Sequence, residues 1–565
     1  MNFEKNRYNI GMDPSTRRGG VFPTPPLFAK KACEYLENRL GKNWAHSGKY
    51  RLWDMAAGTG NLERPLTKEA LRFCFLSTLE QKDVDYLKKE FPDATTFRYD
   101  YLVRDANSVA VGRLPSVVST LQNDLANPDI TWVILVNPPY ATAQESGLTG
   151  KSKQGVADTP IRKLMHSEGL GEVSRELYTQ FLYRIMKDFA GRKAILGLFA
   201  PLKYLVSKNY QKFRDNVFHA AFHSGFVFSS ENFVGTSKTK HFPVSFILWD
   251  IQERKHLADQ DIQLDILDGT AQPIGVKSVR SAHHSEFLSR WITRPRCSKI
   301  FPPFGSALTI KPDNADTRNR IAEGFLASLM CPGNELQNQQ QTAFFSGPQA
   351  SAGALSVTPD NFEQAVVVFA ARRIPENHWT NHIDQFMRPN RELSTQFIAD
   401  CAVWSLFDNK NQTVSLSNVF YQGNIYRIVN HFFPFPVSSF WIRTKPQRHV
   451  ERTFHPSSLC ESGLCEGNKK NSFVAGWLLR QRLSAEAQDV LDGAKAIYRL
   501  YFAHCVKPFD AELCDAELFD VGWYQIRRAL GKAQLGEELF AALKHWRKCL
   551  KDKILPMLHD YGIIG

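Results

Sequence analysis

Several features of membrane and secreted proteins are absent from this chain of 565 residues. No apolar run approaches the roughly 18 residues that a transmembrane helix needs. The first residues, MNFEKNRYNIGMDPSTRRGG, lack the apolar centre of a secretory signal. Acidic residues are in deficit, with 57 Asp and Glu against 70 Lys and Arg, which gives a formal net charge of +13. The 43% hydrophobic and 22% charged residues exclude a disordered chain. We therefore expect a soluble cytoplasmic protein of two or three domains.

Cysteine is scattered rather than clustered among its ten positions. Only Cys460 and Cys465 lie close together, with His449 and His455 nearby. A zinc site usually needs a second such pair. We expect reduced thiols, no disulfide framework and no metal site.

The first 250 residues alternate apolar runs with helical stretches, a pattern that predicts an α/β domain with a mostly parallel sheet. The expected strands are 50–53, 72–79, 96–99, 131–136, 194–200 and 243–249, and the expected helices include 25–40, 84–90 and 175–189.

The alternation fades after residue 250, and the remainder predicts a mixed α+β region that ends in helices. Polar, Gly-rich stretches predict loops at 141–174, 330–360 and 450–472, and helical periodicity returns at 485–503 and 537–550. We expect three domains: 1–255, 256–480 and a helical segment 481–565.

The most informative motif is Asn137-Pro138-Pro139-Tyr140, directly after the apolar run 132–136. Two prolines end the strand and stiffen the turn, so the flanking side chains project in fixed directions. The Asn137 amide oxygen and the Pro138 carbonyl can accept both hydrogens of a planar amino group, and Tyr140 supplies a stacking face. This arrangement suits methyl transfer to an exocyclic amine.

A second motif, Asp54-x-x-x-Gly58-Thr-Gly60, follows the first expected strand. Its glycines allow a cofactor to approach the backbone at a strand-to-helix turn. As a dinucleotide fingerprint it fails, because the third glycine would fall at Glu63. Asp54 suits a cofactor with positive charge, such as the sulfonium and amino groups of S-adenosylmethionine.

Residues 54–62 and 137–140 resemble motifs I and IV of the adenine-N6 DNA methyltransferases, and residues 22–26 resemble their motif X. The order X, I, IV before a large C-terminal region is that of the gamma class, the Taq-type modification enzymes. The resemblance covers about residues 15–250. It implies a Rossmann-like methyltransferase fold, S-adenosylmethionine as cofactor without a metal, a C-terminal target-recognition domain, and a nucleoid-associated setting in a prokaryote or virus.

The same resemblance implies roles for individual residues. Asn137, Pro138, Pro139 and Tyr140 would be catalytic, and Tyr140 would stack on a flipped-out adenine together with Phe233, for which Phe228 is the competitor. Glu80 matches the acid that binds the cofactor ribose, with Asp83 and Asp85 as competitors. The cofactor-binding residues would be Thr24, Pro25, Asp54, Ala56, Gly58, Gly60, Glu80 and Asp100.

Double-stranded DNA is the expected partner. The distribution of charge along the chain, however, does not locate the region that recognises it. Residues 1–250 carry 34 basic and 25 acidic side chains, a net of +9, so most of the positive excess lies outside the expected recognition region. The expected DNA-binding cations are Lys151, Lys153, Arg162, Lys163, Arg443, Lys445, Arg448 and Arg452.

Other functions stay open at this point. An RNA base or a protein glutamine amide is an alternative methyl acceptor, and a catalytically silent DNA-recognition subunit is an alternative of another class. A fused nuclease is not expected, because Pro312-Asp313 lacks the downstream partner of a nuclease motif. A separately encoded restriction nuclease and the oligomeric state stay open.

Overall fold

The computed structural model describes residues 22–103, 118–140, 159–233, 241–311, 321–350, 353–436, 472–505 and 521–565. They form two compact units. The first contains the described residues up to His284 together with His378–Ile383, and the second contains Ser285–Asn377 and Asp384–Gly565. Within the described ranges, every helix is too short or too polar to span a bilayer.

The first unit is built on a nine-stranded sheet with the order β3-β2-β1-β4-β5-β7-β6-β8-β9. The first five strands in this order run parallel, and β7 is antiparallel to both β5 and β6. The strands are β1 (Tyr50–Asp54), β2 (Cys74–Thr78), β3 (Thr95–Arg98), β4 (Thr131–Val136), β5 (Ala194–Pro201), β6 (Ala221–Ser229), β7 (Pro243–Asp250), β8 (Ile262–Leu267) and β9 (Pro273–Val279).

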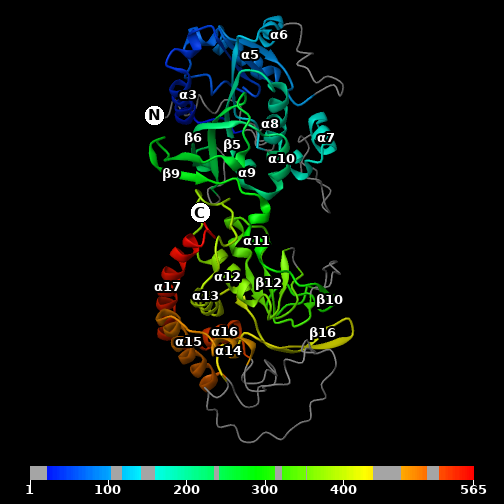
Figure 1. The fold of residues 1–565 in the computed structure, drawn as a ribbon, viewed down its shortest axis with the longest axis vertical. Helices are drawn as coiled ribbons and strands as arrows, with labels where there is room; N and C mark the ends of the chain where they lie inside the picture. Colours follow the sequence, from blue (N-terminus) through cyan, green and yellow to red (C-terminus); the bar gives the residue numbers. More distant parts are fainter. Residues whose placement is uncertain are drawn as a thin grey trace, which may run out of the picture. The chain divides into compact units, whose positions relative to one another are not determined.

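Helices cover both faces of this sheet, as Figure 1 shows for α3 and α8. Strand β4 explains why: Trp132, Ile134 and Val136 pack into one core, whereas Val133 and Leu135 pack into the other. A central parallel strand buried on both faces is therefore apolar throughout. The helices are α3 (Pro26–Leu40), α4 (Lys68–Leu71), α5 (Gln81–Glu90), α6 (Ser119–Ala126), α7 (Pro160–Ser167), α8 (Leu177–Asp188), α9 (Lys203–Val206) and α10 (Gln211–Asn216).

The mostly parallel sheet expected from the sequence is confirmed and is compatible with a Rossmann-like methyltransferase fold. The expected strands and helices of the first 250 residues are present with ends shifted by one to a few residues. Two loop expectations are wrong in part, since α7 lies within 141–174 and the strands Ala343–Phe345 and Ala354–Val357 lie within 330–360. Pro160 at the first turn of α7 and the Thr159 side chain as cap explain why this part of 141–174 is helical.

The sequence does not predict strands β6, β8 and β9, and the last two extend the first unit beyond the expected boundary at residue 255. The apolar pattern of β6 is broken by His223, Ser224 and Gly225, although the strand itself is continuous. Gly225 is required there because a Cβ would lie 2.5 Å from the Phe246 carbonyl oxygen. Strand β8 mixes buried and exposed positions, and β9, which forms the edge of the sheet, has most of its side chains exposed. Since β8 pairs with β6, the expected boundary at 255 falls inside the first unit.

The second unit has one hydrophobic core that continues from 288 to 563 across the expected boundary at 480. A four-stranded sheet, β14-β12-β13-β15, packs with long helices. Its helices are α11 (Leu288–Trp291), α12 (Phe362–Arg373), α13 (Thr395–Leu406), α14 (Phe473–Leu478), α15 (Ala485–His504), α16 (Trp523–Ala533) and α17 (Glu537–Asp560). Its strands are β10 (Cys297–Lys299), β11 (Ile321–Ala322), β12 (Ala327–Met330), β13 (Ala343–Phe345), β14 (Ala354–Val357), β15 (Asn411–Gln412), β16 (Leu416–Tyr421) and β17 (Asn424–Ile428).

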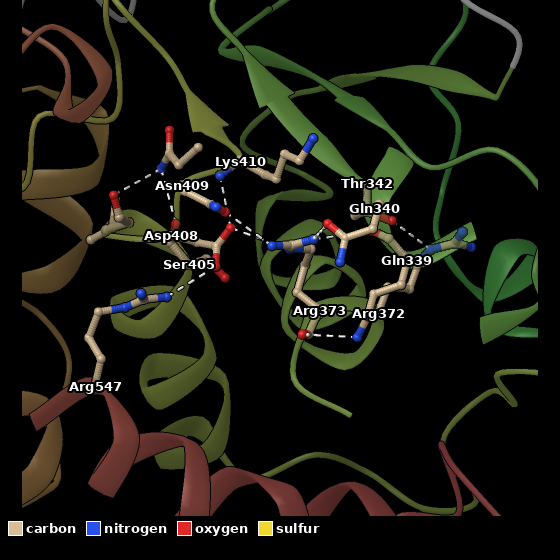
Figure 2. Close-up of polar contacts among 12 residues, drawn as sticks. Gln339, Gln340, Thr342, Arg372, Arg373, Ser405, Asp408, Asn409, Lys410 and Arg547 are labelled. Atoms are coloured by element: carbon tan, nitrogen blue, oxygen red, sulfur yellow. Dashed lines mark hydrogen bonds and ion pairs between the residues drawn. The ribbon is translucent and has the colours of Figure 1, made fainter. Parts of the chain in front are cut away.

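A buried ion cluster joins three helices of this unit (Figure 2). Asp408, just after α13, lies between Arg373 at the end of α12 and Arg547 on α17. The Arg373 Nε is 3.3 Å from one carboxylate oxygen of Asp408, and an Arg547 Nη2 is 3.1 Å from the other. The Asp408 side chain is only 8% exposed, so solvent screens these charges weakly.

Candidate active site at the carboxyl edge of the sheet

The two sequence motifs meet where the strand order reverses. The chain builds β1, β2 and β3 to one side and then places β4 on the other side of β1, with Trp53 paired to Ile134. Asp54 ends β1, and Asn137 directly follows β4. Open parallel sheets bind ligands outside the carboxyl ends of the strands at such a switch point.

The Asn137 amide is held in one orientation by three hydrogen bonds. Its Nδ2 donates to the Phe22 carbonyl oxygen and to Thr24 Oγ1, each at 2.9 Å. Its Oδ1 accepts from the Tyr140 hydroxyl at 2.8 Å. Burial raises the pKa of the Tyr140 hydroxyl, which therefore stays a neutral donor. Both amide hydrogens of Asn137 are donated, so its amide oxygen has to face the Tyr140 hydroxyl. This oxygen has a second lone pair that can accept one more hydrogen bond.

The segment 22–25 links both loops of the site. Besides its bond from Asn137, the buried Thr24 accepts a hydrogen bond at its carbonyl oxygen from Asn61 Nδ2, at 3.2 Å. Pro25 then caps α3, whose first turn begins at Pro26. The structure thus brings the three motifs into one hydrogen-bonded unit, a connection that spacing along the chain did not reveal.

The glycine turn has two positions with different requirements. Gly58 and Gly60 have φ of 53° and 76°, in the left-handed region that favours glycine. A Cβ on Gly60 would lie 2.2 Å from the Phe91 ring, whereas a Cβ on Gly58 would meet only the Ala56 carbonyl oxygen at 3.9 Å. Gly60 is therefore required by packing, and Gly58 leaves space beside the backbone.

Asp54 and Glu63 are two fully buried carboxyl groups at this turn, 1% and 0% exposed. Asp54 Oδ1 accepts from the Ala56 backbone N–H at 2.8 Å. Burial raises the pKa of Asp54, and burial followed by the charge of Asp54 raises the pKa of Glu63. In the sequence, Glu63 stands out only as the place where a third glycine is missing. Its flanking residues, Asn61-Leu62 and Arg64-Pro65, carry no local signal that this carboxyl is buried.

The structure brings Tyr140 and Phe233 together but does not stack them as a pair. Their ring centroids are 6.4 Å apart and the planes are nearly perpendicular, at 89°. The Phe22 ring centroid lies 6.0 Å from that of Tyr140 and 5.9 Å from that of Phe233. The competitor Phe228 is fully buried and stacks on Phe28 at 3.9 Å. This geometry favours Phe233 over Phe228 as the aromatic partner of Tyr140.

The other predicted acids lie at neighbouring strand ends. Glu80 follows β2, is exposed, and occupies the position before the first turn of α5. Of its competitors, Asp83 is half-buried and Asp85 is exposed and accepts from Gln81. Asp100 follows β3, and its carboxylate accepts from the Leu102 backbone N–H at 2.9 Å.

Only part of the predicted DNA-contacting set can be located. Arg162 and the exposed Lys163 lie on α7. Lys151, Lys153, Arg443, Lys445, Arg448 and Arg452 lie outside the described residues, as do His449, His455, Cys460 and Cys465. Among the residues that the structure does describe, no three His, Cys, Asp or Glu side chains gather in a way that could hold a metal ion.

Comparisons with known proteins give remote similarities. No protein-family model and no curated protein matches the chain. Among solved structures, it is similar to the DrdV–DNA complex, with 15% identity, a TM-score of 0.36, and coverage of 58% of this chain and 38% of that one. It is also similar to the EcoKI M protein of a type I restriction enzyme, with 12% identity, a TM-score of 0.25, and coverage of 43% and 48%.

A third similarity extends over most of both chains. It is to the type IIL restriction-modification enzyme MmeI in complex with DNA, with 10% identity, a TM-score of 0.33, and coverage of 97% of this chain and 81% of that one. The chain spans less than half the length of the other two proteins.

Proposed function

We propose that this protein is a DNA methyltransferase that transfers a methyl group from S-adenosylmethionine to the N6 amino group of adenine. The observation that carries the proposal is the fixed Asn137 amide, whose oxygen is directed by the Thr24 and Phe22 bonds and lies at the strand-order reversal next to Asp54.

Asn137 would act as an acceptor for the target amino group. A fixed amide oxygen and the Pro138 carbonyl, each taking one N–H, reduce the conjugation of the amino nitrogen with its ring. The lone pair of that nitrogen then points out of the ring plane. Such orientation of two reactants supplies much of the rate in transfer reactions without a covalent enzyme intermediate.

The turn at 54–60 fits S-adenosylmethionine. Gly58 leaves space beside the backbone, the Asp54 carboxyl suits a cationic group, and the exposed Glu80 suits ribose hydroxyls. Thr24, Pro25, Ala56, Gly60 and Asp100 would complete the site. The cofactor supplies an electrophilic methyl group, and the chain supplies position and charge.

Adenine in a duplex has to leave the base stack before its amino group reaches Asn137. Tyr140 and Phe233 would then stack on the base, each contact contributing about 1–3 kcal/mol. Because these two rings meet edge to face, they have to separate to admit a base. Arg162 and Lys163, with the cations outside the described residues, are proposed phosphate contacts.

The test is incorporation of tritiated methyl groups with genomic DNA, total RNA and a release factor as separate acceptors. We expect label in DNA, as N6-methyladenine after digestion. Label only in RNA or protein would replace the DNA proposal with one of those acceptors. Cofactor binding without any transfer would favour a silent recognition subunit, as part of a restriction-modification system.

Thr24→Val tests the orientation of Asn137. Valine has the shape of threonine but offers no acceptor to the Asn137 Nδ2. The loss of one oriented hydrogen bond should lower kcat about 2- to 10-fold, a larger factor than the rise in the Kd of S-adenosylmethionine, whose other proposed contacts remain. Thr24→Ser keeps the hydroxyl and should restore kcat. An equal loss in both variants would contradict the role of the hydroxyl.

Gly60→Ala tests the difference between the two glycines. The added methyl meets Phe91 and the backbone stays left-handed, so the free energy of unfolding should fall by about 2–4 kcal/mol. Gly58→Ala should lose only about 1–2 kcal/mol, from the left-handed backbone alone. Urea unfolding followed by circular dichroism measures both. Equal losses would show that the Phe91 contact relaxes.

A further inference from the structure

The carboxyl pair Asp54–Glu63 is not explained by the fold. Glu63 is completely buried, and neither of its carboxyl oxygens has a hydrogen bond of normal geometry. Among the described residues, the hydrogen-bonding groups that act on this carboxyl are Asp54 and the Glu63 backbone N–H. Burying a carboxylate without a partner costs several kcal/mol. Such a carboxyl either only destabilises the fold or has a functional role.

The groups that surround the pair leave most of its charge uncompensated. Cys33 faces it from α3 and Cys74 faces it from β2, and burial together with Glu63 raises the pKa of both thiols, which are therefore neutral. Glu34 and Glu37 on α3 add only negative charge near Cys33. Arg64, the next residue, is a cation whose charge lowers the pKa of Glu63.

Arg64 compensates the pair only in part: its charge lowers the pKa of Glu63, but less than burial and Asp54 raise it. Its guanidinium donates to Glu90 Oε1 at 2.6 Å and to the Tyr86 hydroxyl at 2.8 Å, on the side of α5. Two ionised carboxylates in this buried space would repel each other with only this partial compensation. The pair therefore holds one proton and one negative charge near neutral pH, and the two groups titrate together.

We propose that Asp54 and Glu63 form a proton-coupled site for the cationic end of S-adenosylmethionine, which keeps one proton while the site is free and releases it to solvent when the cofactor binds. This inference rests on the proposed function. It makes Glu63 a positioning residue that acts through Asp54.

The physical reason is charge balance. A positive charge next to Asp54 lowers the pKa of both carboxyls, so the shared proton leaves as the cofactor arrives. The pair changes from one negative charge to two, which matches the ammonium and sulfonium charges of the cofactor. A glutamine at position 63 would have the same shape as protonated Glu63 but no proton to release.

Isothermal titration calorimetry with S-adenosylmethionine in two buffers of different ionisation enthalpy measures the released protons. We expect the wild type to release up to about one proton more per cofactor than Glu63→Gln at pH 7.5. The affinity of the wild type for S-adenosylmethionine should rise by up to about tenfold per pH unit, which is the limit when binding releases one proton. Glu63→Gln should bind with a Kd that varies much less between pH 6.5 and 8.5.

Asp129→Asn, which changes an exposed carboxyl, is the matched control and should behave as the wild type. Equal proton release by wild type and Glu63→Gln overturns the inference. Absence of cofactor binding by the wild type instead overturns the proposed function.

A second measurement needs no ligand. Glu63 has a pKa raised above its unfolded value, so its burial is tolerated while it is protonated, and stability falls as pH rises above the unfolded pKa towards the folded one. The Tm of the wild type should therefore fall relative to that of Glu63→Gln between pH 5 and 9. A constant difference across this range would show that the pair does not share a proton.

Discussion

Asn137→Ala should reduce methyl transfer to DNA by about 10²- to 10³-fold in kcat, the range seen when one fixed hydrogen-bonding group is removed from an active site. The variant loses the amide oxygen that would accept the target amino group. It also loses the bonds to Phe22 and Thr24 that hold the segment 22–25. Single-turnover transfer of tritiated methyl groups to genomic DNA measures the effect.

The effect on chemistry can be separated from an effect on folding or on cofactor binding. The Kd of S-adenosylmethionine should change only a few-fold, because Asp54 and the glycine turn remain, so the loss should fall on kcat. Asn209→Ala changes an exposed asparagine outside the proposed site and should retain normal transfer. Near-normal transfer by Asn137→Ala would end the amino-group proposal.

Asp408→Asn should lower the free energy of unfolding of the second unit by about 3–5 kcal/mol, because it leaves the guanidinium groups of Arg373 and Arg547 buried without their counter-charge. Burial already lowers the pKa of Arg547, which shows that its surroundings disfavour charge. The remaining partners of Arg373 are the neutral acceptors Gln339, Gln340 and Asn409 (Figure 2). Urea unfolding of the full chain measures the loss.

Two further variants sharpen this test. Asp552→Asn removes an exposed carboxylate from α17 and should stay within about 0.5 kcal/mol of the wild type. The double variant Asp408→Asn, Arg547→Met also removes one of the two guanidinium charges that lack a counter-charge. It should therefore recover part of the lost free energy of unfolding. A loss below about 1 kcal/mol for Asp408→Asn would mean that water reaches and screens the cluster.

The sequence located much of the first unit because its signals are local. A short apolar run such as 131–136, with prolines directly after Asn137, is typical of a strand buried on both faces, and the prolines end it at one place. The glycines at 58 and 60 predicted a turn after the first strand, and in the structure both have positive φ. The unexpected strands β8 and β9 carry weaker signals, because strands at or next to a sheet edge contain exposed polar residues, as many loops do.

The amino-acid sequence by itself thus determined the class of fold, the two loops of the candidate site and the residues Asp54, Asn137 and Tyr140. Only the tertiary structure decided how these act on one another: that Thr24 holds both Asn137 and Asn61, that the Phe233 ring meets Tyr140 whereas Phe228 stacks on Phe28, and that Glu63 shares a buried space with Asp54. The physical reason is that burial, hydrogen bonding and charge coupling depend on groups far apart in the chain. The parallel sheet brings those groups to one edge.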